Sequence, residues 1–95
     1  MNVLYNKIVN ERNKNQPGTL KYDDENNVFT QLLGAAFCNS VNPDHLPAAI
    51  TINRVIMREN QLDDLLSRLG LSNYVITVLS SSFVYGYSYL VEFSS

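Results

Sequence analysis

The chain has 95 residues, a net charge of -2, 45% hydrophobic side chains and 17% charged ones. Without a positive net charge it offers no general attraction for nucleic acid or acidic membranes, and no apolar run approaches the roughly 20 residues of a membrane span. The length suits one domain with a single core, so we expect residues 1–95 to form one domain.

The cysteine content and the N-terminal residues indicate a reducing compartment. Cys38 is the only cysteine, so no disulfide can form within the chain. Residues 1–16 lack the basic and apolar regions of a signal peptide. We expect a cytoplasmic protein, in its own cell or in a host cell. A viral origin would fit this expectation but does not follow from the residues.

The N-terminal half predicts helices on either side of a polar loop. Hydrophobic residues within residues 1–9 have near-helical spacing, although a short strand fits almost as well. Residues from about 10 to 27 are polar and contain a Pro-Gly turn signal, so we expect an exposed loop there. A helical stripe then begins after the acidic residues at 23–25, which suit a helix N-terminus. The stripe consists of Val28, Phe29, Leu32, Leu33, Ala36 and Phe37.

Residues 44–57 fit two kinds of structure. Their hydrophobic spacing fits a helix that Asp44 would cap, and a helix is our prediction. The stretch "AITINRVIM" nevertheless has the composition of a strand, so extended residues 50–57 would add a third strand to the sheet. The next helix is clearer, because Asn60 can cap it, four leucines share one face and Gly70 can end it.

Residues 71–95 contain one charged side chain, Glu92, and predict an antiparallel hairpin with strands at about 74–80 and 83–93. Side chains alternate along a strand, so the odd-numbered residues from 83 to 93 share one face. Phe83, Val91 and Phe93 suit a dry core. The predicted fold class is therefore α+β, with three or four short helices packed on a C-terminal antiparallel β-hairpin.

The sequence indicates no catalytic residue, no cofactor and no metal. One cysteine and one histidine cannot complete a zinc site, and neither EF-hand nor phosphate-binding glycine motifs occur. Cys38 and His45 could be drawn as a nucleophile and its base, but Cys38 ends its predicted helix, where the helix dipole disfavours a thiolate. The acidic pair Asp63 and Asp64 lies in a helix's first turn, where capping alone accounts for carboxylates.

A nucleic-acid-binding regulator is the alternative function. The stretch "LDDLLSRLGLSNYVITVLSSSF" has the outline of a helix-turn-helix followed by a hairpin, as in a winged helix. However, its supposed recognition helix, "SNYVITVLSS", contains no Lys or Arg and prefers a strand. Phosphate contacts dominate affinity for DNA, so the sequence argues against a nucleic-acid partner.

The hairpin gives the main functional hypothesis. Tyrosine is enriched at the centres of protein interfaces, and a bare uncharged edge strand would invite aggregation. We therefore predict a non-catalytic protein–protein interaction module, inhibitory or adaptor in kind, that self-associates as a homodimer through its C-terminal hairpin. A small cysteine-dependent enzyme is the third hypothesis. The residues predicted to form the interface are Tyr74, Val84, Tyr85, Tyr87, Tyr89 and Leu90.

Overall fold

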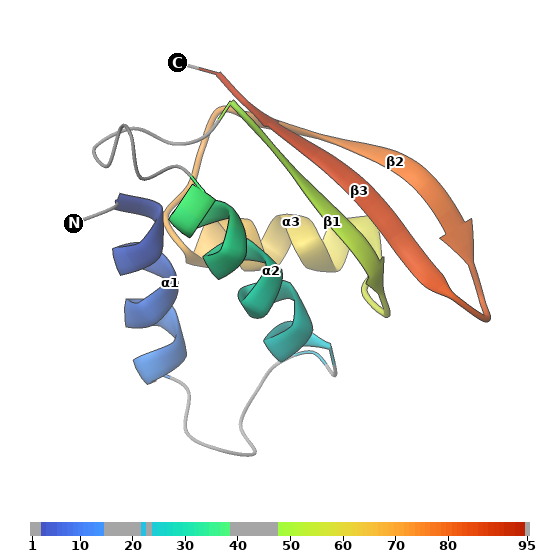
Figure 1. Cartoon of the computed structure of the whole chain (residues 1–95), viewed down its shortest axis with the longest axis horizontal. Helices are drawn as coiled ribbons and strands as arrows, with labels where there is room; N and C mark the ends of the chain where they lie inside the picture. The colour runs from blue at the N-terminus through green and yellow to red at the C-terminus, as the bar shows by residue number, and fades with distance from the viewer. Residues whose placement is uncertain (1–2, 15–21, 23, 39–47, 95) are drawn as a thin grey trace.

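The computed structural model describes residues 3–14, 22, 24–38 and 48–94. These residues form helices packed on one face of a three-stranded antiparallel sheet, and the hairpin reaches beyond the helices (Figure 1). The predicted α+β class is confirmed. In chain order the elements are α1 (Val3–Lys14), α2 (Glu25–Cys38), β1 (Ala49–Val55), α3 (Glu59–Arg68), β2 (Tyr74–Ser82) and β3 (Gly86–Phe93).

The helices that flank the predicted loop at about residues 10–27 are longer than the sequence indicated. α1 covers the first residues of that range and α2 covers the last ones, so both ends of the predicted loop are helical. The strand alternative within residues 1–9 is wrong for the described residues 3–9, which are helical. The polar end of α1 is helical because Glu11 is buried where it meets Arg68 of α3, an arrangement that polarity alone does not reveal.

Residues 44–47 of the predicted helix across 44–57 lie outside the described residues, and for the rest the prediction is wrong, because β1 occupies residues 49–55. Ile50 and Ile52 are buried and alternate with exposed residues, which is the period of a strand. Antiparallel pairing with β3, which places Ile50 opposite Val91 and Ile52 opposite Tyr89, decides the conformation. The third strand that the alternative implied is therefore confirmed.

The predicted leucine-rich helix is confirmed as α3, whose inward side chains are Leu62, Leu65 and Leu66. It ends as expected, because Gly70 follows it with a φ of +81°. Its first turn begins earlier than predicted: the amide of Arg58 donates to Oε1 of Gln61 at 2.9 Å, so Asn60 is not the cap.

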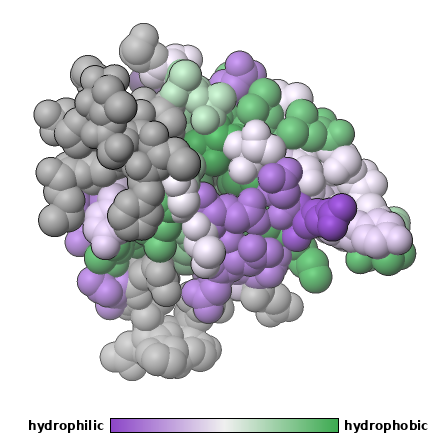
Figure 2. Space-filling model, in the orientation of Figure 1, coloured by the Kyte–Doolittle hydropathy of each residue, from purple (hydrophilic) through white to green (hydrophobic). Residues whose placement is uncertain are grey.

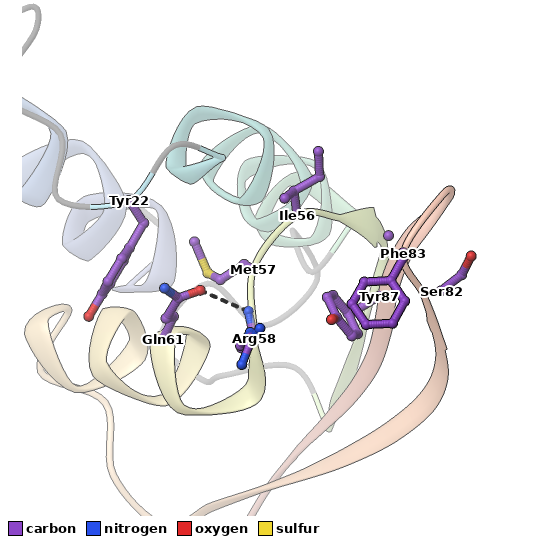
Figure 3. A pocket seen from close by; sticks show the side chains of 9 residues that line it. Tyr22, Ile56, Met57, Arg58, Gln61, Ser82, Phe83 and Tyr87 are labelled. Carbon is purple, nitrogen blue, oxygen red and sulfur yellow. Dashed lines mark hydrogen bonds between the residues drawn. The ribbon is translucent and has the colours of Figure 1, made fainter.

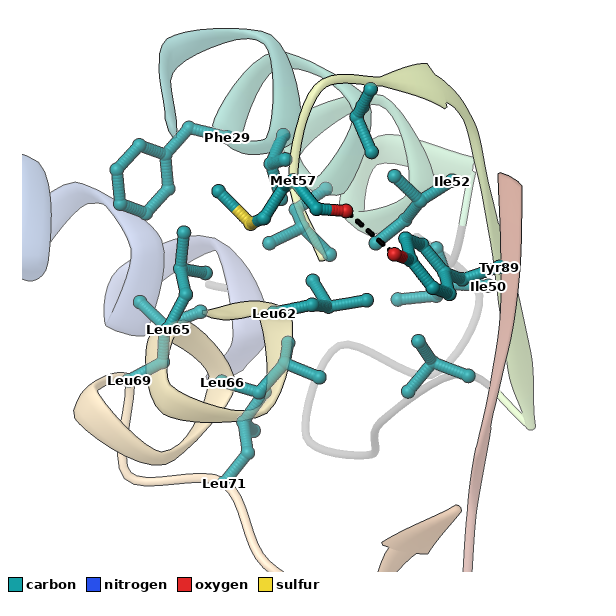
Figure 4. Close-up of a cluster of buried hydrophobic side chains, with 14 of the residues drawn as sticks. Phe29, Ile50, Ile52, Met57, Leu62, Leu65, Leu66, Leu69, Leu71 and Tyr89 are labelled. Carbon is teal, nitrogen blue, oxygen red and sulfur yellow. Dashed lines mark hydrogen bonds between the residues drawn. The ribbon is translucent and has the colours of Figure 1, made fainter. Parts of the chain in front are cut away.

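The core lies between the sheet and the helices (Figure 4). β3 is the central strand of the order β1-β3-β2, and Tyr89 and Val91 point from it into the core, as the alternation predicted. The prediction for Phe83 is wrong, because β3 begins only at Gly86 and the preceding turn leaves Phe83 97% exposed. The buried hydrophobic residues are Ile8, Val28, Phe29, Leu32, Ile50, Ile52, Val55, Met57, Leu62, Leu65, Leu66, Leu69, Leu71, Tyr89 and Val91.

A buried ion cluster joins the three helices. Arg68 of α3 pairs with the fully buried Glu25 of α2, and its Nη1 lies 3.4 Å from Oε1 of Glu11 on α1. Its Nε is 3.4 Å from Oδ2 of Asp64, and its guanidinium lies 5.7 Å from the ring centre of Tyr22. Burial lowers the pKa of Arg68, but the hydrogen bond to Glu25 and the neighbouring carboxylates raise it above its ordinary value. The cluster therefore keeps a charged guanidinium opposite a buried carboxylate.

Side chains from α2 and the residue before it fix the end of β1 and the loop that follows. Gln31 exchanges two hydrogen bonds with the backbone of Asn53, at 2.7 and 2.9 Å. Asp24 Oδ2 accepts the amide of Ile56 at 2.7 Å. Between these contacts the β1–β3 register shifts and Arg54 adopts a φ of +53°, which is typical of a bulge. The path of the chain from β1 to α3 is thereby held in place.

Gly86 allows β3 to begin close against the end of β1. Its φ is +89°, and an added Cβ would lie 3.0 Å from the carbonyl oxygen of Val55 and 3.1 Å from the carbonyl carbon of Arg54. Both atoms belong to the backbone and cannot rotate away. This contact fixes the position of the hairpin tip relative to β1.

We expect Gly86→Ala to lower the free energy of unfolding by about 2 kcal/mol, because the new Cβ disfavours the positive φ and crowds the β1 backbone. Gly34→Ala is the matched control. Gly34 is exposed in α2 with nothing within 4 Å of an added Cβ, so this change should add up to about 1 kcal/mol. Urea denaturation measures both variants; equal midpoints would contradict the constraint at Gly86.

Candidate interaction surface

Among the described residues, the acidic side chains near the helix starts have structural partners. Glu25 and Asp64 belong to the ion cluster with Arg68, and Asp24 accepts the amide of Ile56. Within the described residues, no group of three or more His, Cys, Asp and Glu residues is placed to hold a metal ion. The side chain of Cys38 and all of His45 lie outside the described residues. In the described part of the chain, no helix combines the length and hydrophobicity needed to cross a bilayer.

Tyr74 and Tyr89, two of the predicted interface residues, face the helices. The Tyr74 hydroxyl donates to Oδ1 of Asp63 on α3 at 2.5 Å, and burial together with this bond raises the pKa of Tyr74. The Tyr89 hydroxyl donates to the carbonyl oxygen of Met57 at 2.6 Å, and burial raises the pKa of Tyr89 to about 12. Tyr89 is 1% exposed, so it belongs to the core and is closed to a partner.

Val84 and Tyr85, two further predicted interface residues, lie in the turn between β2 and β3 together with Phe83. The exposed fractions are 97% for Phe83, 82% for Val84 and 71% for Tyr85. Ser82 Oγ accepts the amides of Val84 and Tyr85 at 3.2 and 3.1 Å, which holds the turn. We call residues 83–85 the hairpin tip. Phe83 was not predicted to lie at the surface, although the serine run before it is a turn signal.

Leu90, another predicted interface residue, lies on the side of the sheet turned away from the helices, which we call the outer face. In the register, Leu90 stands between Thr51 of β1 and Thr77 of β2, and Val75 stands opposite Glu92. Figure 1 shows the three helices on the other side of the sheet. At these positions the outer face therefore consists of small and apolar side chains. Glu92 is the charged residue among them.

The two edges of the sheet differ. At the β1 edge, Gln31 of α2 already occupies the backbone amide and carbonyl of Asn53, next to the bulge. The β2 edge is open: in the described chain, β2 pairs with β3 alone. Its nine residues, "YVITVLSSS", include no charged side chain and no proline, and Val75 is 59% exposed. Charge and proline are the usual protection of an edge strand, so this edge is suited to pairing with another chain.

A groove of about 300 Å³ separates the hairpin tip from the start of α3 (Figure 3). Its apolar part includes the buried Met57 and the exposed Ile56, and its polar part includes Arg58 and Gln61. Tyr87, the sixth predicted interface residue, is half-buried here, and its ring stacks on Tyr89 with centres 6.3 Å apart. The lining residues are Tyr22, Ile56, Met57, Arg58, Gln61, Ser82, Phe83, Gly86 and Tyr87.

The exposed hydrophobic residues of the chain are concentrated on the hairpin. Figure 2 shows hydrophilic residues across the middle of the visible face, and a mixture of pale and hydrophobic residues along the sheet and at the far end of the hairpin. Exposed large hydrophobic residues are Ile56, Val75, Val78, Leu79, Phe83, Val84 and Tyr85, and all but Ile56 belong to the hairpin. Apolar residues gathered in this way are typical of interaction sites.

Comparison of the chain with protein-family models, curated proteins and solved structures finds no match in any of the three. Function is therefore inferred from the surfaces of the chain itself.

We expect Tyr89→Phe to lower the free energy of unfolding at neutral pH by about 1 kcal/mol, because the Met57 carbonyl loses its donor. The pKa of Tyr89 is raised from 10.0 to about 12, so the unfolded chain loses this proton first and stability should fall between those pH values. The variant should show a smaller alkaline loss in urea titrations across that range. Tyr85→Phe, in the exposed turn, is the control; the same alkaline loss in both variants would contradict the assignment.

Proposed function

We propose that this protein is a non-catalytic protein–protein interaction module that associates with itself through its C-terminal hairpin. The observation that carries the proposal is the open β2 edge, a nine-residue strand with no charged side chain and with Val75 and Leu79 exposed. Burying each such side chain in an interface is worth roughly 1.5–3 kcal/mol. Backbone pairing along the edge adds direction and register.

A symmetric dimer fits this edge. An antiparallel pair of β2 strands related by a two-fold axis would present the same residues from both copies and join the two sheets into one. In such a contact, any charge on β2 would lie close to the same charge on the other copy and repel it. β2 carries no charged side chain, so this repulsion does not arise. The nearest charge on the outer face, Glu92, belongs to the inner strand β3.

The alternative, a nucleic-acid-binding regulator, receives no support from the arrangement of the elements. The stretch that would have to be its recognition helix is β2. The helix that precedes it, α3, carries Glu59, Asp63 and Asp64, which would repel phosphates.

Val75→Lys should convert the protein from a dimer to a monomer at tens of micromolar. The lysine stands opposite Glu92 of the same chain, so the isolated fold gains a cross-strand ion pair while two approaching β2 edges repel each other. Light scattering after size-exclusion chromatography measures the molar mass, and the single chain is 10.8 kDa.

Thr30→Lys, on the exposed side of α2, introduces the same charge away from the sheet and should leave the dimer intact. High salt should partly restore association of Val75→Lys, because it screens the repulsion. A wild-type protein that is strictly monomeric at this concentration, or a Val75→Lys variant that remains dimeric, would refute association through the β2 edge.

A further inference from the structure

The groove beneath the hairpin tip is a second surface, separate from the β2 edge. It lies on the helix side of the sheet, between the tip and the loop that joins β1 to α3 (Figure 3). Its volume of about 300 Å³ is at the lower end of binding pockets, enough for one or two side chains. Its floor is held in place, because the carbonyl of Met57 accepts the buried Tyr89 hydroxyl.

The apolar part of the groove is exposed although the core lies next to it. Ile56 is 74% exposed and Phe83 is almost fully exposed, and both residues line the groove together with Met57. Tyr87 continues the aromatic surface toward the core through its stack on Tyr89. A large apolar side chain inserted here would cover these residues at once.

The polar part of the groove offers donors for a negatively charged group. Arg58 lines it, and the backbone of Arg54 lies next to its end, against Gly86. Within the described chain, neither arginine makes an ion pair. The amide oxygen of Gln61 accepts the Arg58 amide, which leaves the Gln61 amide nitrogen able to donate.

Among the described residues near the groove, the carboxylates of Asp24 and Glu59 are engaged or directed elsewhere. Asp24 accepts the amide of Ile56, and Glu59 lines a different depression together with Asp63 and Tyr74. The groove therefore combines an apolar floor with guanidinium and amide donors. Its complement is an apolar side chain next to an acid.

We infer that this groove binds a segment of a partner protein in which a large apolar side chain stands beside a carboxylate. The apolar side chain packs between Ile56 and Phe83 over Met57, and the carboxylate pairs with Arg58. The site is complete in one chain and does not depend on self-association through β2.

Two other occupants fit the groove less well. The tip of a second copy would bring Phe83 and Val84 but no carboxylate, because no charged side chain occurs between Arg68 and Glu92. An anionic membrane would attract the two arginines by only about 1 kcal/mol each and would leave the concave part of the surface unused.

Selection of short random peptides displayed on phage, with the purified protein as target, tests this inference. We expect the enriched peptides to share a large apolar residue next to Asp or Glu. A synthetic peptide from the enriched set should bind at least tenfold more weakly to Arg58→Glu and to Phe83→Ser. A version of that peptide with Lys in place of its acid should regain affinity for Arg58→Glu, which a merely misfolded variant could not do.

Two further variants separate this site from the β2 edge. Asn13→Glu adds a glutamate at an exposed position of α1. This control variant should bind the peptide as the wild type does. The Val75→Lys variant should also bind normally, whether or not the wild type is dimeric. The inference is wrong if enriched peptides carry no excess of acids, if Arg58→Glu binds as well as the wild type, or if Val75→Lys loses binding. It is also wrong if the protein binds phosphatidylserine-containing vesicles in an Arg58-dependent way but selects no peptide.

Discussion

The hydrogen bond from the buried Tyr89 hydroxyl to the carbonyl of Met57 links the sheet to the helical layer, and the rest of the structure depends on this link. Tyr89 stands on the central strand of the sheet, and Met57 lies in the loop that delivers the chain to α3. The bond satisfies two polar groups that burial would otherwise leave unpaired. It thereby places α3 against the sheet, and the groove between that loop and the hairpin tip takes its shape from the same contact.

The helical layer is joined by ion pairs as well as by apolar contacts. Arg68, on the last turn of α3, meets carboxylates from both other helices, and Glu25 is fully buried beside it. Replacing such a cluster by apolar side chains is often tolerated, whereas removing one partner is costly because the remaining charge stays buried. We therefore regard the cluster as setting the mutual orientation of the helices rather than as the main source of stability.

The sequence predicts most of the fold and part of the candidate interaction surface. Helix α3 and the alternation along β3 could be predicted because leucine spacing, Gly70 and the aromatic period are local signals. β1 could not, since only its pairing with β3 distinguishes a strand from a helix there. Likewise, Val84 and Tyr85 could be predicted at the surface, whereas the exposure of Phe83 depends on where the turn begins. The groove, too, joins segments that are distant in the chain.

The hairpin extends past the helices, and its stability should therefore vary along its length. Near Tyr74 and Phe93 the strands are anchored by α3 and by aromatic packing, while the tip has few buried neighbours. Local opening requires the least free energy where the fewest buried contacts are lost. Backbone amides near the tip should then exchange with solvent faster than those near the base of the hairpin. Opening of the hairpin near its tip can therefore take place while the core between the sheet and the helices remains closed.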